Sequence, residues 1–100
     1  MSMLDEILAK REELYAIARK HQAEKLWVFG SVARREERPD SDVDFLVKFG
    51  PEYSWHGECQ MKDDLERLFR RDIDVVHNTA VLNPANARFA SVVCREAVAI

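Results

Sequence analysis

Two short apolar runs, each interrupted by residues unusual for a simple core strand, constrain this chain most. The first, residues 26–29, is rich in β-forming side chains and stops at Gly30 and Ser31. The second, residues 43–49, carries Asp44 within it and Asp42 directly before it. Short apolar runs bounded by turn residues predict buried strands. We therefore expect a small sheet with carboxylates built into one of its strands.

The N-terminal segment has apolar residues at helical spacing and predicts an amphipathic helix over residues 3–22. Ser2 is expected to cap this helix, with Asp5 as the return partner in a capping box. A second helix is expected around residues 61–69, after a mobile loop over residues 50–58.

Further along the chain, residues 73–76 predict a third strand. Asn83 as N-cap and Pro84 at the first helical position predict a last helix, with Phe89, Val92 and Val93 on its core face. Residues 97–100 are expected to form an edge strand. The order of elements predicts an α+β fold of two layers (α/β two-layer), in which helices flank a small mixed sheet of three to four strands.

Length and composition narrow the function. One hundred residues suit a single domain spanning 1–100 and exclude large barrels and full dinucleotide-binding folds. A net charge of −3 argues against a protein that binds the phosphate backbone of a nucleic acid. We interpret Cys59 and Cys94 as reduced thiols of a cytoplasmic protein. We expect neither a signal peptide nor a membrane association.

Asp42 and Asp44 lie two residues apart on one strand, so their side chains share a face. Two neighbouring carboxylates repel each other unless a cation lies between them, and a hard divalent ion such as Mg²⁺ prefers such oxygen ligands. The alternative is a strand end at which both acids are solvated. Asp74 lies in the third strand and is favoured over Asp72 as a third carboxylate, able to complete a metal site and accept a proton.

Gly30 and Ser31 follow a predicted strand. The glycine permits a close approach of the backbone to a ligand, and Ser31 is expected to cap a short helical segment over residues 32–35. Free N–H groups at a helix start attract phosphate oxygens. Taken alone, this dipeptide is also compatible with an ordinary turn.

The combined pattern of Gly30-Ser31, ten intervening residues and Asp42-Val43-Asp44 resembles the signature of the DNA polymerase β-like nucleotidyltransferase superfamily. Length and surrounding sequence look most like its minimal nucleotidyltransferases, the MNT family. The resemblance covers nearly the whole chain and implies the nucleotidyltransferase core fold of that superfamily.

The resemblance implies a mechanism. ATP is the expected substrate, with two Mg²⁺ ions as cofactors. Gly30 and Ser31 inherit the binding of the β- and γ-phosphates, and Arg34 is compatible with either a phosphate contact or a solvated position. Asp42 and Asp44 inherit metal binding, and Asp74 completes one metal site and helps to deprotonate the acceptor. All three acids are thus catalytic candidates.

The family also implies a partner. Many MNT proteins are antitoxins that transfer AMP to a tyrosine of a HEPN ribonuclease toxin and so inactivate it. Two alternatives stay open: a catalytically silent module that neutralises the toxin by contact, and nucleotide transfer to a small-molecule acceptor. His21, His77 and the pair Trp55 and His56 are interpreted as structural, although His77, Trp55 and His56 are each compatible with a nucleotide or partner contact.

Overall fold

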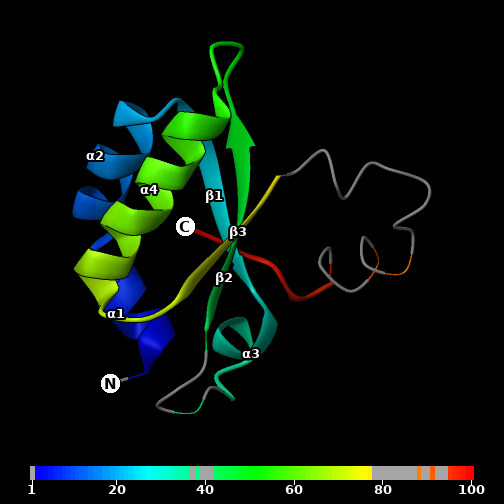
Figure 1. The fold of residues 1–100 in the computed structure, drawn as a ribbon. Helices are drawn as coiled ribbons and strands as arrows, with labels where there is room; N and C mark the ends of the chain where they lie inside the picture. Colours follow the sequence, from blue (N-terminus) through cyan, green and yellow to red (C-terminus); the bar gives the residue numbers. More distant parts are fainter. Residues whose placement is uncertain (1, 37, 39–41, 78–87, 89–90, 92–94) are drawn as a thin grey trace.

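The computed structural model describes residues 2–36, 38, 42–77, 88, 91 and 95–100. Its centre is a four-stranded sheet with the strand order β3-β2-β1-β4 (Figure 1). The helices are α1 (Met3–Ala9), α2 (Arg11–Lys20), α3 (Gly30–Ala33) and α4 (Trp55–Phe69). The strands are β1 (Ala23–Phe29), β2 (Val43–Phe49), β3 (Ile73–His77) and β4 (Val98–Ala99). The mixed α+β architecture expected from the sequence is confirmed.

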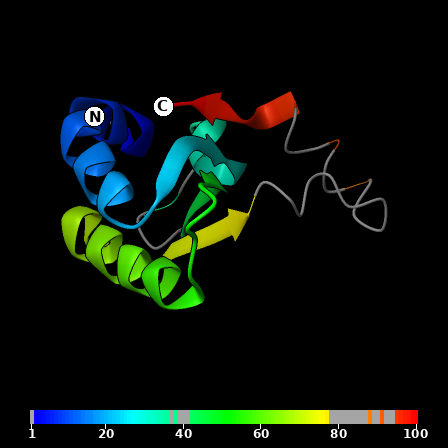
Figure 2. The same cartoon turned by 90° about the horizontal axis from the view of Figure 1, so that it is seen from above.

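The sheet is mixed because β2 pairs antiparallel with β1 and parallel with β3. The parallel pair needs a crossover connection, and α4 supplies it. In the view from above, α1, α2 and α4 all lie against one face of the sheet (Figure 2). β4 pairs antiparallel with β1 at the other edge, which confirms the expected edge strand.

Two apolar clusters lie on the two faces. The larger one packs the helices on the sheet, and alternate residues of β2 (Val43, Phe45 and Val47) are fully buried in it. The smaller one lies on the opposite face around Phe29 and Leu46. This alternation leaves Asp44 on the face that α1, α2 and α4 do not cover.

The N-terminal segment departs from the expected single helix. The capping box at Ser2 and Asp5 is confirmed, since each side chain accepts a hydrogen bond from the other residue's backbone N–H. Lys10, however, has non-helical backbone angles and separates α1 from α2. Its amino group bonds Glu6 and the backbone carbonyl of Leu68 on α4. The spacing of apolar residues along the N-terminal segment cannot indicate such a contact with a distant helix.

The expected mobile loop over residues 50–58 is wrong at its C-terminal end, because α4 begins at Trp55. Ser54 is the N-cap, and its hydroxyl accepts a hydrogen bond from Gly57 N. Apolar periodicity misses these first turns because their side chains largely stand clear of the core, and buried positions start at Met61. The expected helix opened by Asn83 and Pro84, with Phe89, Val92 and Val93, lies outside the described residues.

Candidate active site

The geometry of the candidate site rests on Asp44 and Asp74. They are register partners in the parallel pair of β2 and β3, so both side chains emerge from the same face of the sheet. The two carboxyl groups lie close enough for the charge of Asp74, and hydrogen bonding to it, to raise the pKa of Asp44. A hydrogen bond between two carboxyl groups requires one proton, so the pair can share a single proton or bind a cation in its place.

Asp44 titrates far from its ordinary range. Partial burial raises the pKa of Asp44 to about 6, and the charge of Asp74 and the hydrogen bond to it act in the same direction. The charge of Asp42 adds a smaller increase, while Arg34 opposes it. A carboxyl with a raised pKa and like-charged neighbours favours any cation that replaces its proton.

The two remaining acids lie at the start of the strands. Asp42 is exposed, directly before β2, and close enough for its charge to act on Asp44. Asp72 precedes β3, where its backbone carbonyl accepts a hydrogen bond from Val43 N at 2.9 Å. The register therefore places Asp74, rather than Asp72, beside Asp44.

Gly30 is in direct proximity to the carboxylates. Phe29, the last residue of β1, pairs with Asp44, and Gly30 follows with φ +75°. A Cβ atom at Gly30 would lie 2.5 Å from Asp44 Oδ2. Both the left-handed backbone and the close approach therefore require glycine at this position.

Ser31 lies inside α3 and does not cap it. The helix begins at Gly30 with Phe29 as N-cap, so the expected capping role of Ser31 is wrong. The helix starts at Gly30, which has a positive φ, two residues earlier than residue preferences indicate. The segment after α3 is tied to the N-terminus, because Arg35 donates to Ser2 Oγ and to Asp5.

Arg34, the C-cap of α3, is held by two carboxylates. Its Nε lies 3.0 Å from Glu36 and its Nη1 lies 2.7 Å from Glu96. These hydrogen bonds, that to Glu36 first, raise the pKa of Arg34. Glu96 comes from the segment before β4, more than sixty residues away in sequence, and only the fold reveals this contact.

The donor set fits a hard divalent cation. Within the described part of the chain, no group of three or more acidic, imidazole or thiol side chains surrounds a common metal position. Asp44 and Asp74 alone are adjacent. Mg²⁺ needs no larger protein cage, because it commonly takes one or two carboxylates and completes its shell with water and substrate phosphates.

The remaining candidates lie elsewhere. His77 is three residues beyond Asp74 on β3, hence on the helix-covered face, where its Nε2 lies 3.1 Å from Glu58. Trp55 and His56 open α4, after the end of β2 opposite to Asp44. His21 is buried at the C-cap of α2 and bonds Asp64 at 3.0 Å. The structural interpretation of His21 and His77 agrees with these contacts.

Glu58 and Tyr53 form a partly buried polar contact that the sequence did not signal. The Tyr53 hydroxyl donates to Glu58, which also meets His77. Desolvation, with the Glu58 contact second, raises the pKa of Tyr53 to about 12. Phe49 packs on both rings, 4.7 Å from Tyr53 and 4.8 Å from His77. The cluster joins the C-terminal ends of β2 and β3 to α4.

Residues 12–99 match the family model described as polymerase beta, nucleotidyltransferase, so the chain belongs to this family of nucleotidyltransferases. It is accordingly an enzyme that transfers a nucleotidyl group. Its sequence is 33% identical over 66 residues to MJ0435 of Methanocaldococcus jannaschii, whose name assigns it provisionally to the protein adenylyltransferases. That match covers 66% of this chain and 71% of the relative.

Solved structures agree with this assignment. A minimal nucleotidyltransferase superposes with a TM-score of 0.81 at 36% identity, covering 100% of this chain and 97% of that one. A toxin–antitoxin complex with AMP-PNP gives 0.68 at 14% identity over 88% of this chain and 69% of that one. A complex of tri-AMPylated Shewanella oneidensis HEPN toxin with MNT antitoxin gives 0.62 at 15% identity, over 92% and 69%. These last two show a shared fold.

Among the described residues, none of the helices is both long and apolar enough to cross a bilayer.

Proposed function

We propose that this enzyme is an antitoxin that transfers AMP from ATP to a tyrosine of a HEPN-type toxin, in the cytoplasm and with Mg²⁺ bound at the carboxylates. The observation that carries the proposal is the proton-sharing pair of Asp44 and Asp74 beside the glycine turn. The Shewanella oneidensis complex supports it, since an AMP-modified HEPN toxin is bound there to an MNT antitoxin.

The proposed roles follow from position. Asp44 and Asp74 are proposed to hold Mg²⁺ with oxygen ligands, and Asp42, the exposed acid directly before β2, is proposed as a further ligand. Gly30 and Ser31 present the backbone of the α3 start to the β- and γ-phosphates. When bound, the ions neutralise phosphate charge and orient the reacting groups.

The chemistry is a displacement at phosphorus. The tyrosine oxygen forms a bond to the α-phosphorus of ATP, and the bond from that phosphorus to the oxygen bridging to the β-phosphorus breaks. Pyrophosphate leaves with the electron pair of the broken bond. Asp74, which is exposed at the sheet surface, accepts the proton of the tyrosine hydroxyl. The domain is proposed to act as one unit over residues 1–100.

The test is co-expression with a HEPN-type protein encoded beside this chain, followed by intact-mass analysis of that protein. The wild-type enzyme should add AMP units, whereas Asp44→Asn and Asp74→Asn should add none. Asp72→Asn is the matched control, because it removes an equivalent exposed acid outside the pair and should preserve transfer. Transfer at the wild-type level by Asp44→Asn would overturn the catalytic assignment.

The same variants distinguish inactivation of the toxin by AMP transfer from its neutralisation by contact alone. If Asp44→Asn and Asp74→Asn abolish AMP transfer and toxin activity returns, inactivation is chemical. If both variants still neutralise the toxin fully, the contact-only alternative replaces the proposal.

A further inference from the structure

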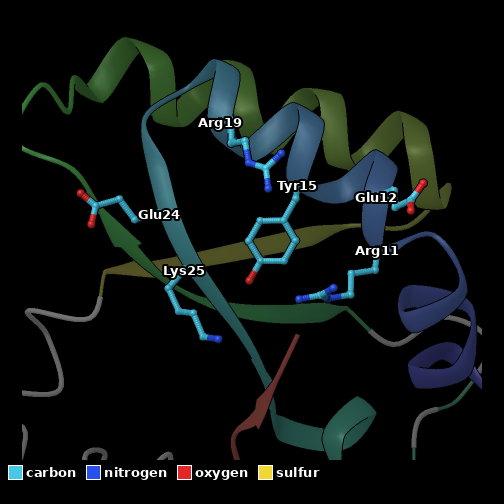
Figure 3. A pocket seen from close by; sticks show the side chains of 6 residues that line it. All are labelled: Arg11, Glu12, Tyr15, Arg19, Glu24 and Lys25. Atoms are coloured by element: carbon cyan, nitrogen blue, oxygen red, sulfur yellow. The ribbon is translucent and has the colours of Figure 1, made fainter.

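A hollow of 660 Å³ lies between α2 and the start of β1, away from the carboxylate pair. Figure 3 shows its lining of six side chains, four from α2 and two from β1. The residues are Arg11, Glu12, Tyr15, Arg19, Glu24 and Lys25. Its volume lies in the range of ligand sites in proteins.

The cations of this hollow are not neutralised by ion pairs. Among the described residues, no carboxylate lies within ion-pair distance of Arg11, Arg19 or Lys25. In Figure 3 the guanidinium groups of Arg11 and Arg19 lie on two sides of the Tyr15 ring, while the side-chain ends of Lys25, Glu12 and Glu24 point away from it. Glu24 instead meets Lys48 at 3.9 Å. Two guanidinium groups beside one ring repel each other, and carboxylates placed against them relieve this repulsion.

Tyr15 gives the hollow a rigid floor. Its hydroxyl donates to the carbonyl of Ile100 at 2.9 Å and accepts from Leu26 N at 3.4 Å. The guanidinium carbons of Arg11 and Arg19 lie 5.4 and 5.9 Å from its ring centroid, within reach of cation–π attraction. The ring therefore holds both guanidinium groups in place, which lowers the entropy cost of binding an anion between them.

The spacing of the cations favours an extended chain over a compact anion. Arg11, Tyr15 and Arg19 recur every four residues on α2, and the two guanidinium carbons, 5.4 and 5.9 Å from the Tyr15 centroid, are at most about 11 Å apart. In an extended segment, carboxylates four residues apart are separated by about 13 Å. Lys25 lies at the β1 edge, beyond the two residues that β4 pairs. The next residue, Leu26, already donates its N–H to Tyr15 and accepts from Ile100 N, so an added segment would bind here through its side chains.

We propose that this basic hollow docks an extended acidic segment of a partner protein, with alternating carboxylates that meet Arg11, Arg19 and Lys25. The site is distinct from the nucleotide site, because Lys25 lies four residues before Phe29 on β1, about 13 Å along the strand, and Phe29 is the residue paired with Asp44. Docking therefore goes beyond AMP transfer and leaves the carboxylates free.

The experiment is an NMR titration of the full chain with a short capped peptide that alternates Glu with Thr. The amide signals of residues 11–25 should shift and saturate, and an analogue with Gln in place of Glu should not produce this. The double variant Arg11→Gln/Arg19→Gln should weaken binding by about tenfold, because each exposed contact contributes modestly. The control variant Lys62→Gln removes a positive charge from an exposed position on α4 and should bind the Glu peptide like the wild type.

Two further probes identify the class of anion. Tripolyphosphate and a single-stranded oligonucleotide of matched charge should bind these residues more weakly than the Glu peptide. Tighter binding of either one, or equal binding of the Gln analogue, overturns the proposal. Asp44→Asn should bind the Glu peptide unchanged while losing AMP transfer, so that failure of docking and failure of the proposed function are distinguishable.

Discussion

Asp44 and Asp74 face each other across the only parallel strand pair of the described sheet and lie within reach of hydrogen bonding. Their proximity raises the pKa of Asp44, so this carboxyl group keeps its proton at a higher pH than an ordinary aspartate does. Proton binding and cation binding at this point are therefore competing events.

Magnesium binding should depend on pH through Asp44. Because the pKa of Asp44 is raised to about 6, protons compete with Mg²⁺ as the pH falls through that value. The rise in Tm that Mg²⁺ produces should be large at about pH 8 and mostly lost at about pH 5. Thermal unfolding with and without Mg²⁺ checks this, and Asp44→Asn should show little rise at either pH. A rise independent of pH would contradict a metal bound by Asp44.

Asp44→Asn should stabilise the protein at neutral pH without metal. The folded pKa of about 6 exceeds the ordinary value of 3.8, so the folded state holds the proton more tightly. Stability contributed by this group is therefore lost as pH rises from about 4 to about 6. Allowing for its partial exposure, we expect a gain of about 1 kcal/mol at pH 7 and none below about pH 4. Urea unfolding at both pH values measures the difference.

Gly30→Ala should destabilise the protein and abolish transfer. The backbone has φ +75°, which costs an L-residue about 1–2 kcal/mol, and the new methyl group would meet Asp44 at 2.5 Å. Gly57→Ala is the matched control: it lies within α4, where alanine is the better helix former. Chemical denaturation should separate the two variants, and equal stability of both would refute the requirement for glycine at position 30.

Arg34→Gln tests whether Arg34 leaves Glu36 and Glu96 to contact a phosphate of ATP. If it does, the variant should raise the KM for ATP by about tenfold, with a smaller effect on kcat. Glu36 and Glu96 now hold its guanidinium. Arg95→Gln, a neighbouring exposed arginine, serves as the control. Steady-state kinetics of pyrophosphate release decide the question, and an unchanged KM would leave Arg34 as a purely structural ion-pair partner.

His21→Ala should destabilise the fold by about 2 kcal/mol, because it removes a buried imidazole and leaves Asp64 with only its exposed partner Arg67. His56→Ala removes the same side chain from an exposed position on α4, where it meets Gln60, and should change stability little. The free energies of unfolding from urea titrations test the pair. Equal losses would show that burial of His21 adds nothing.

Local patterns determined much of this protein. The capping box at Ser2, the strand types of β1 and β2, and the placement of Asp42 and Asp44 on one stretch of chain all follow from residues near one another in sequence. They follow because hydrogen bonding within a turn and side-chain alternation along a strand are short-range effects.

Tertiary structure decided what depends on distant pairing. The register of β2 with β3 selects Asp74 over Asp72, and the fold brings Glu96 to Arg34. The same holds for the break at Lys10, whose side chain reaches Leu68. No local pattern specifies these contacts, because strand register and helix packing are set by the summed burial of the whole core.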